Sequence, residues 1–159
     1  MDSNSIIYQK AESRLEDYLA AHGMRKTPER YEILRAACAM TGLFSIDELA
    51  QRMQDEATFQ VSRVTLFNSL ETFVDAQLVI KHSLKRAALY ECNIENKPRV
   101  YLVCDKCDTV KSMEKSDVMN YLRTLRSRSF VVRQPVLYLH GLCKKCDIQQ
   151  RKQMKKENK

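Results

Sequence analysis

The sequence lacks any hydrophobic run as long as a membrane-spanning segment. Its first ten residues, MDSNSIIYQK, also lack the charged and then apolar pattern of a signal peptide. We therefore expect a soluble, cytoplasmic protein without a membrane partner. Because that compartment is reducing, structural disulfides are disfavoured, and the six cysteines are better explained as metal ligands than as cross-links.

Histidine is scarce, since the chain has three, at His22, His82 and His140. Of these, His82 lies close in sequence to Glu91 and Cys92 across a predicted hairpin, which makes the three candidate ligands for an effector. No fixed metal spacing supports such a cluster, so a hydrogen-bonded or solvated histidine is the alternative interpretation.

The N-terminal half has no excess of positive charge. The whole chain has a formal net charge of +7, but its last nine residues, RKQMKKENK, supply +4 of it. Residues 1–82 hold nine Lys and Arg against twelve Asp and Glu. Overall basicity therefore does not identify a DNA-binding part, and only the local arrangement of side chains can do so.

The chain begins with the pattern of two helices. Apolar residues at helical spacing predict a helix over residues 5–21, which Gly23 would end in a left-handed conformation. A second helix is predicted from Thr27, as the cap, and Pro28, at the first helical position, as far as Gly42.

Two shorter helices are predicted next. Ser45 and Glu48 have the spacing of a capping box, and Ser62 opens a fourth helix whose apolar stripe leaves Arg63, Thr65 and Asn68 outside it. Three or four short helices joined by tight links, the last with a polar outer face, are typical of a helix-turn-helix domain.

Strand patterns dominate the rest of the chain. Residues 79–84 (VIKHSL) and 88–94 (ALYECNI) predict a hairpin, which would make the first domain a winged helix. Residues 100–143 predict strands around one amphipathic helix, a second α/β domain. The predicted class is α+β, with these parts: a winged-helix DNA-binding domain at 1–84, a junction at 85–99, a zinc-binding dimerisation domain at 100–148, and a basic tail at 149–159.

Two C-x-x-C pairs, Cys104 with Cys107 and Cys143 with Cys146, each follow an apolar strand pattern. A C-x-x-C turn places two thiolates on one side of an ion, and two such turns complete the tetrahedral shell of zinc. Four protein ligands leave no position for a substrate water, so the predicted zinc is structural. A disulfide pair and a redox-active C-x-x-C are the alternatives.

Six short motifs in this order resemble those of the ferric uptake regulator (Fur) family. They are GMRKTPERYEIL at 23–34, S-x-x-E-L at 45–49, SRVTLFNSL at 62–70, ALYEC at 88–92, LVCDKC at 102–107 and YLHGLCKKC at 138–146. The resemblance covers most of the chain. It implies a homodimeric, metal-responsive repressor with an N-terminal winged helix and a C-terminal dimerisation domain, and not an enzyme.

The resemblance also assigns roles to residues. It places structural zinc on the four paired cysteines and a DNA-contacting basic residue on Arg25. The family's recognition-helix motif, T-V-Y-R, falls on residues 65–68, which adds Phe67 to the candidate DNA contacts Ser62, Arg63, Thr65 and Asn68. Phe can touch a thymine methyl group and Asn can pair with adenine, so we expect an operator different from that of other members.

The chain departs from the family where the sensory metal binds. The family's H-x-H-L-I-C reads RVYLVC at 99–104, the histidine before S-x-x-E-L is absent at 42–44, and the hairpin acid survives as Glu91. Without imidazoles the usual iron site is predicted to be broken. A second metal at the His82 cluster, or haem bound through Cys38 or Cys92, is left as the candidate effector.

The predicted function is therefore a dimeric regulator, a repressor of metal or haem homeostasis genes, that binds an inverted-repeat operator in double-stranded DNA. A zinc-ribbon adaptor that binds proteins and not DNA is the alternative, and it leaves the capped helices unexplained. A thiol-redox enzyme, the third class, requires exposed cysteines of low pKa.

Overall fold

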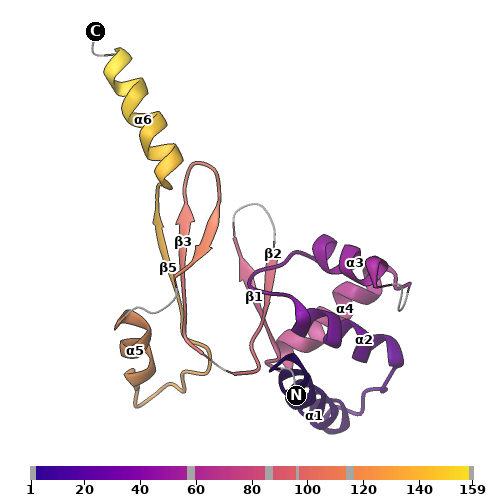
Figure 1. Ribbon diagram of the computed structural model, residues 1–159. Coiled ribbons are helices and arrows are strands. Elements are labelled where there is room, and N and C mark those ends of the chain that lie inside the picture. Colours follow the sequence, from indigo (N-terminus) through magenta and orange to yellow (C-terminus); the bar gives the residue numbers. More distant parts are fainter. Residues whose placement is uncertain (1–2, 57–59, 85–87, 96, 114–116, 158–159) are drawn as a thin grey trace. The chain divides into compact units, whose positions relative to one another are not determined.

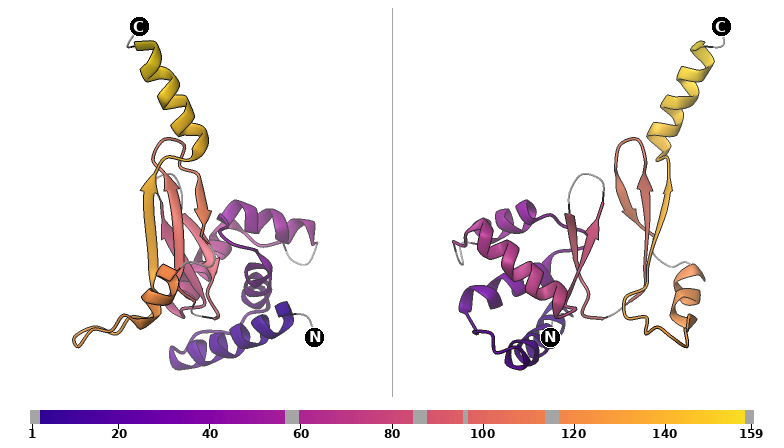
Figure 2. Two further views of the ribbon diagram at one scale, coloured as in Figure 1. Left: turned by 60° about the vertical axis from the view of Figure 1, so that its left-hand side comes forward. Right: turned by 180° about the vertical axis from the view of Figure 1, so that it is seen from behind.

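The computed structural model describes residues 3–56, 60–84, 88–95, 97–113 and 117–157. The chain folds as two compact units, Met1–Glu95 (unit 1) and Asn96–Lys159 (unit 2). Unit 1 is mostly helical with one hairpin, and unit 2 is built on a small sheet (Figures 1 and 2). The predicted α+β class is confirmed. No helix among the described residues is long and apolar enough to cross a bilayer.

Unit 1 has the order of elements of a winged helix. Its elements are α1 (Ser3–Ala21), α2 (Pro28–Ala39), α3 (Ile46–Asp55), α4 (Arg63–Asp75), β1 (Val79–Ser83) and β2 (Ala88–Cys92). The two strands form an antiparallel hairpin that pairs Val79 with Cys92 and His82 with Leu89. The link before α3 joins this hairpin, because Phe44 and Tyr90 exchange backbone hydrogen bonds of 2.9 and 2.7 Å.

The helix ends follow the predicted caps in most places. Gly23 has φ +61°, and beyond it the Met24 N–H donates to the Leu19 carbonyl at 2.9 Å, which closes α1. The capping box at the start of α3 is complete, with the Ser45 N–H donating to Glu48 Oε2 at 2.7 Å and the Glu48 N–H donating to Ser45 Oγ at 3.2 Å. Thr27 occupies the cap position of α2, but its side chain makes no capping hydrogen bond.

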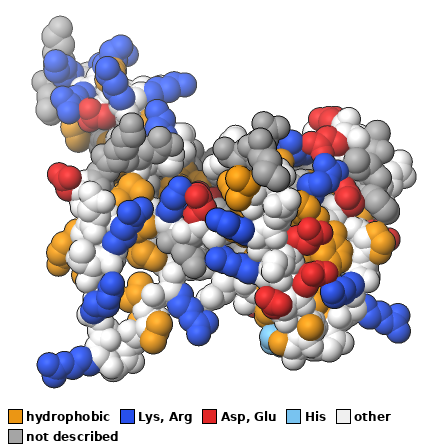
Figure 3. Space-filling model, turned by 60° about the horizontal axis from the view of Figure 1, so that its bottom comes forward, with side chains coloured by type: hydrophobic (Ala, Val, Ile, Leu, Met, Phe, Trp, Pro, Cys, Tyr) orange, Lys and Arg blue, Asp and Glu red, His pale blue; other side chains and the backbone are white. Residues whose placement is uncertain are grey.

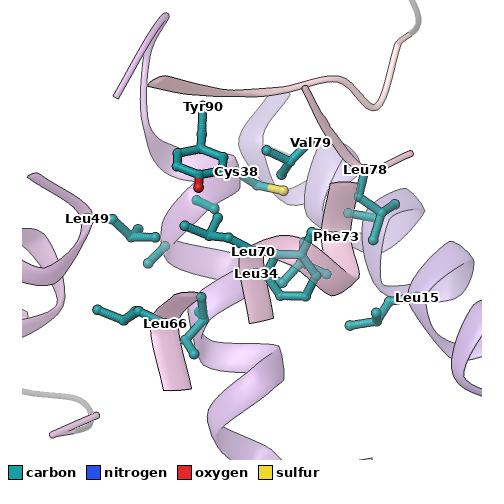
Figure 4. Close-up of a cluster of buried hydrophobic side chains, with 14 of the residues drawn as sticks. Leu15, Leu34, Cys38, Leu49, Leu66, Leu70, Phe73, Leu78, Val79 and Tyr90 are labelled. Carbon is teal, nitrogen blue, oxygen red and sulfur yellow. The ribbon is translucent and has the colours of Figure 1, made fainter. Parts of the chain in front are cut away.

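The core of unit 1 gathers side chains from all four helices and the hairpin. Helix α1 contributes Leu15 and Leu19, and helix α4 contributes Leu66, Leu70 and Phe73, all almost fully buried. Figure 4 shows Leu66, Leu70 and Phe73 of α4 beneath the hairpin residues Val79 and Tyr90. The apolar stripe of α4 thus faces inward, which turns the opposite side of this helix to solvent.

Unit 2 is a three-stranded sheet with two helices. Its elements are β3 (Arg99–Cys104), β4 (Val110–Ser112), α5 (Asp117–Thr124), β5 (Val136–Gly141) and α6 (Lys144–Glu157). The strand order is β4-β3-β5, with β3 antiparallel to β4 and parallel to β5. No residue of α5 is buried.

Some boundaries differ from the predicted ones. Unit 1 continues to Glu95 because β2, which lies in the predicted junction 85–99, pairs with β1. Residues 85–87 and 96 of that junction lie outside the described residues. The stretch 130–143 has the pattern of one or two strands, and the structure forms one there, β5, which begins at Val136. Most of the predicted tail, as far as residue 157, belongs to α6.

Candidate metal centre and nucleic-acid interface

The four paired cysteines converge at one end of the unit 2 sheet. Cys104 ends β3, Cys107 lies in the turn to β4, and Cys143 and Cys146 lie at the start of α6. Their four Sγ atoms all lie within 4.8 Å of one another. The parallel pairing of β3 with β5 brings the pairs together, because it places Cys104 opposite Gly141 in the register.

The spacing of the sulfurs fits a tetrahedral zinc ion. Zinc–sulfur bonds of about 2.3 Å give an edge of about 3.8 Å between two ligands of a tetrahedron. The Sγ atoms of Cys107 and Cys143 lie 3.8 Å apart. That separation equals the expected edge, and the 4.8 Å limit on the others is compatible with a structural zinc site, in which four protein ligands leave no position for a substrate.

Hydrogen bonds prepare two of the sulfurs to act as thiolates. The Cys143 N–H donates to Cys104 Sγ at 3.3 Å, and this bond is the main reason that the pKa of Cys104 falls to about 6. The Thr109 hydroxyl lies 3.0 Å from Cys107 Sγ and is the main cause of the lowered pKa of that thiol. In contrast, burial raises the pKa of Cys146 to about 12. Thr109 lay outside the sequence prediction, although its position two residues after Cys107 is the signal that identifies it.

Helix α4 and its cap carry the residues predicted to contact DNA bases and phosphates, here called the reading surface: Ser62, Arg63, Thr65, Phe67 and Asn68. Ser62 caps this helix by accepting a 3.1 Å hydrogen bond from the Thr65 N–H. Arg63, Phe67 and Asn68 are exposed, with Phe67 showing 46% of its surface to solvent. The exposed Phe67 ring beside Arg63 and Asn68 gives this side of the helix both apolar and hydrogen-bonding groups.

Val64 belongs to the same surface and was missed. It is 68% exposed, more than Phe67, and lies in the first turn of α4. Its position three residues before Phe67 places the two on one side of the helix, and a valine methyl can contact a thymine methyl group as a phenyl ring can. Counting helical turns from Phe67 would have found it.

Two contacts hold the reading surface before any DNA is present. Arg63 forms an ion pair with Asp47 in the first turn of α3. On the other side, the Lys81 ammonium of the hairpin lies 5.7 Å from the centre of the Phe67 ring and 2.7 Å from the Glu71 carboxylate. The hairpin and α3 thus both fix side chains of α4. Arg25 is exposed in the link between α1 and α2.

The structure separates the predicted effector ligands. His82 Nε2 and Glu91 Oε2 lie 3.6 Å apart, and His82 is fully buried. Cys92 is the next residue along the strand, so its side chain points to the opposite face, where its Sγ lies 3.4 Å from Cys38 Sγ. Among the described residues, the four paired cysteines alone form a group of three or more metal-ligating side chains. The three candidate ligands therefore do not form one site, since neighbouring strand residues face apart.

Comparison with known proteins places this arrangement in a family. The family model described as Ferric uptake regulator family matches residues 21–147, which include the elements α2 to β2 of the winged helix and all four paired cysteines. A curated relative, the zinc uptake regulation protein of Escherichia coli (strain K12), is 27% identical over 143 residues, which are 87% of this chain and 82% of the relative.

Solved structures share the fold. The ferric uptake regulator from Pseudomonas aeruginosa with manganese superposes with a TM-score of 0.64 at 22% identity, over 81% of this chain and 97% of that one. A zinc uptake regulator complexed with zinc and DNA gives a TM-score of 0.51 at 23% identity, over 95% of this chain and 99% of that one. Because the family model spans most of the sequence and both units, the chain belongs to the ferric uptake regulator family of DNA-binding transcription regulators.

Proposed function

We propose that the protein is a homodimeric, sequence-specific repressor of metal-homeostasis genes, with structural zinc bound by Cys104, Cys107, Cys143 and Cys146. The observation that carries the proposal is the convergence of four thiols, within 4.8 Å, in the unit that follows a winged helix. Zinc supplies a cross-link there and no chemistry. The chain's own groups support it, because the Cys143 N–H and the Thr109 hydroxyl stabilise two of the thiolates.

The apolar surface of unit 2 supports the homodimer. Eleven large apolar side chains of the described part of unit 2 are exposed, among them Tyr121 at 66%, Phe130 at 69% and Val131 at 78%. Unit 1 has three such side chains in its described residues, and two of them lie on α4. A second copy of unit 2 would remove these side chains from water, as at the apolar interfaces of obligate homodimers.

The reading surface of α4 supports recognition in the major groove. Asn68 can form two hydrogen bonds with adenine, while Val64 and Phe67 can contact thymine methyl groups. Arg63 and Arg25 can each reach a phosphate, although Arg63 must first leave Asp47. Since a dimer carries two such helices related by a two-fold axis, the operator is an inverted repeat.

Metal is the better supported class of effector. A curated relative is named for zinc uptake regulation. Haem bound through Cys38 is disfavoured, because Cys38 is 8% exposed and is packed in the core of unit 1. We therefore expect the regulated genes to be those of metal homeostasis.

Selection of binding sites from a random DNA pool tests the proposal. Zinc-loaded protein should enrich an inverted repeat, should hold about one tightly bound zinc per chain, and should migrate as a dimer. The selection is repeated with added iron, manganese or zinc, so that a change in enrichment identifies the effector. Zinc-loaded dimers that enrich no sequence would instead support the protein-binding adaptor and overturn the proposal.

A further inference from the structure

Two cysteines outside the metal centre lie in contact with each other. Cys38 is in the last turn of α2, and Cys92 is the last residue of β2. They are 54 positions apart in the sequence, yet their Sγ atoms are separated by 3.4 Å and are not bonded covalently. Unit 1 therefore holds a pair of facing thiols that the proposed function does not use.

The two sulfurs differ in their access to solvent. Cys38 is 8% exposed and is packed in the unit 1 core, where Figure 4 shows it beside Val79 and Tyr90. Cys92 lies at the edge of that core and is partly exposed. The S–H···S contact with Cys92, together with burial, raises the pKa of Cys38. Cys92 is thus the more accessible of the two residues to a reagent from solution.

We propose that Cys38 and Cys92 are a redox-active pair, which a small disulfide such as oxidised glutathione converts to an intramolecular disulfide. A disulfide bond is about 2.05 Å long, so the sulfurs need to approach by about 1.4 Å from their present separation. A small rotation of the two side chains supplies this movement. The zinc thiolates lie in unit 2 and take no part.

The reaction proceeds in two exchange steps. In the first, Cys92 Sγ attacks one sulfur of the small disulfide, forms a mixed disulfide and releases one small thiol, which takes up the Cys92 proton. In the second, Cys38 Sγ attacks Cys92 Sγ and expels the second small thiol, which takes up the Cys38 proton. The protein loses two electrons and two protons, and the small disulfide gains them.

The new bond would tie the helical part of unit 1 to its hairpin. The Phe44–Tyr90 backbone bridge already joins these parts close to the same point. A covalent link that closes a long loop restricts the unfolded chain, so the oxidised protein unfolds at a higher temperature, by about 10 °C. The oxidation state of the cell would thereby act on the DNA-binding unit independently of metal.

Peptide mapping tests the proposal on the full-length, zinc-loaded protein. The protein is incubated with oxidised glutathione, remaining thiols are alkylated, and trypsin is added without reductant. Cleavage after arginine places Cys38 in the peptide 36–52 and Cys92 in the peptide 87–99. We expect these two peptides to be joined, with the loss of two hydrogens, while the zinc content is unchanged.

Two variants make the order of the steps visible. Cys38→Ser should accumulate glutathione on Cys92, because no second thiol resolves the mixed disulfide. Cys92→Ser should leave Cys38 unmodified, because Cys38 is buried. Equal modification of both variants would overturn the proposal, and so would a joined peptide that forms only after zinc is lost.

Discussion

The two units reach stability by different means. Of the buried apolar residues in the described chain, nineteen lie in unit 1 and five in unit 2, and two of those five are the zinc-site cysteines Cys104 and Cys146. Unit 1 has eleven Lys and Arg against fourteen Asp and Glu, whereas unit 2 has sixteen against six. On the face shown in Figure 3, acidic side chains are accordingly more frequent over unit 1.

The difference shows that a small unit with few buried apolar residues needs another source of stability. A chain segment as small as unit 2 buries too little surface to be stable alone, and metals or oligomerisation usually compensate. Unit 2 has the features for both, because it combines four converging thiols with an exposed apolar surface. Unit 1 needs neither, so the two units should respond differently to the same treatment.

Loss of one zinc ligand should have the largest effect. Cys143→Ser removes a thiolate and the tetrahedral shell, and structural zinc contributes apparent free energies of about 10–16 kcal/mol to small domains. We expect unit 2 to unfold and the dimer to dissociate, while the helical circular dichroism of unit 1 persists. Sedimentation and zinc analysis measure the result.

Cys38→Ser is the matched control for that variant, since it removes a thiol outside the zinc site. It should retain zinc and the dimer. If Cys143→Ser lost its zinc but remained a dimer with unit 2 folded, unit 2 would not depend on its metal for stability.

A large-to-small substitution in the core of unit 1 should destabilise unit 1 and leave the zinc site of unit 2 intact. Phe73 is fully buried on α4, and Phe73→Ala should lower the free energy of unfolding by about 3–5 kcal/mol. The zinc content should not change, because Phe73 lies in the other unit. Denaturant titration and zinc analysis measure the two quantities, and Val64→Ala, at an exposed position of the same helix, is the control. Release of zinc by Phe73→Ala would show that the units are not independent.

Substitution of the reading surface should change DNA binding and nothing else. Asn68→Ala removes a pair of base contacts worth about 1–3 kcal/mol, so the affinity for the selected operator should fall by roughly 5- to 150-fold. Titration of labelled DNA measures it. Asn120→Ala on α5, an exposed asparagine in unit 2, should leave the affinity unchanged. Equal losses in both variants would contradict a reading role for α4.

The smallest predicted effect is an increase in DNA affinity. Asp47→Asn removes the carboxylate that pairs with Arg63, and an exposed pair of this kind is worth about 0–1 kcal/mol. The released Arg63 should raise DNA affinity by up to about fivefold at low salt. Affinity measured across salt concentrations should also show a steeper slope. Asp55→Asn, at the other end of α3, is the control, and a weaker complex with Asp47→Asn would mean that the pair positions Arg63 for DNA.

Local signals in the sequence predicted much of both units. Ser45 with Glu48 predicted the start of α3, and Gly23 predicted the end of α1, because caps depend on neighbouring residues alone. The doubled C-x-x-C predicted the cluster of four thiols although its two pairs are distant in the sequence, because a tetrahedral zinc site requires four ligands. Other contacts between distant segments had no such signal in the sequence. The pairing of Arg63 with Asp47 and of Cys38 with Cys92 depends on how the helices and the hairpin pack.

The face of the strand to which each side chain points also limited what the sequence could predict. His82, Glu91 and Cys92 are close in sequence and lie on paired strands, yet alternation along β2 turns Glu91 and Cys92 to opposite sides. The hairpin was predicted, but the register that assigns each side chain to a face was not. The three residues predicted as one ligand cluster therefore make two different contacts, His82 with Glu91 and Cys92 with Cys38.

Hydrogen exchange resolved by unit, before and after removal of zinc by a strong chelator, tests the central claim most directly. The account predicts that amides of β3 and β5 lose their protection when zinc is removed, while amides of α1 and α4 keep theirs. Protection of β3 and β5 that survives in metal-free protein would contradict it, since the sheet would then be stable without its cross-link.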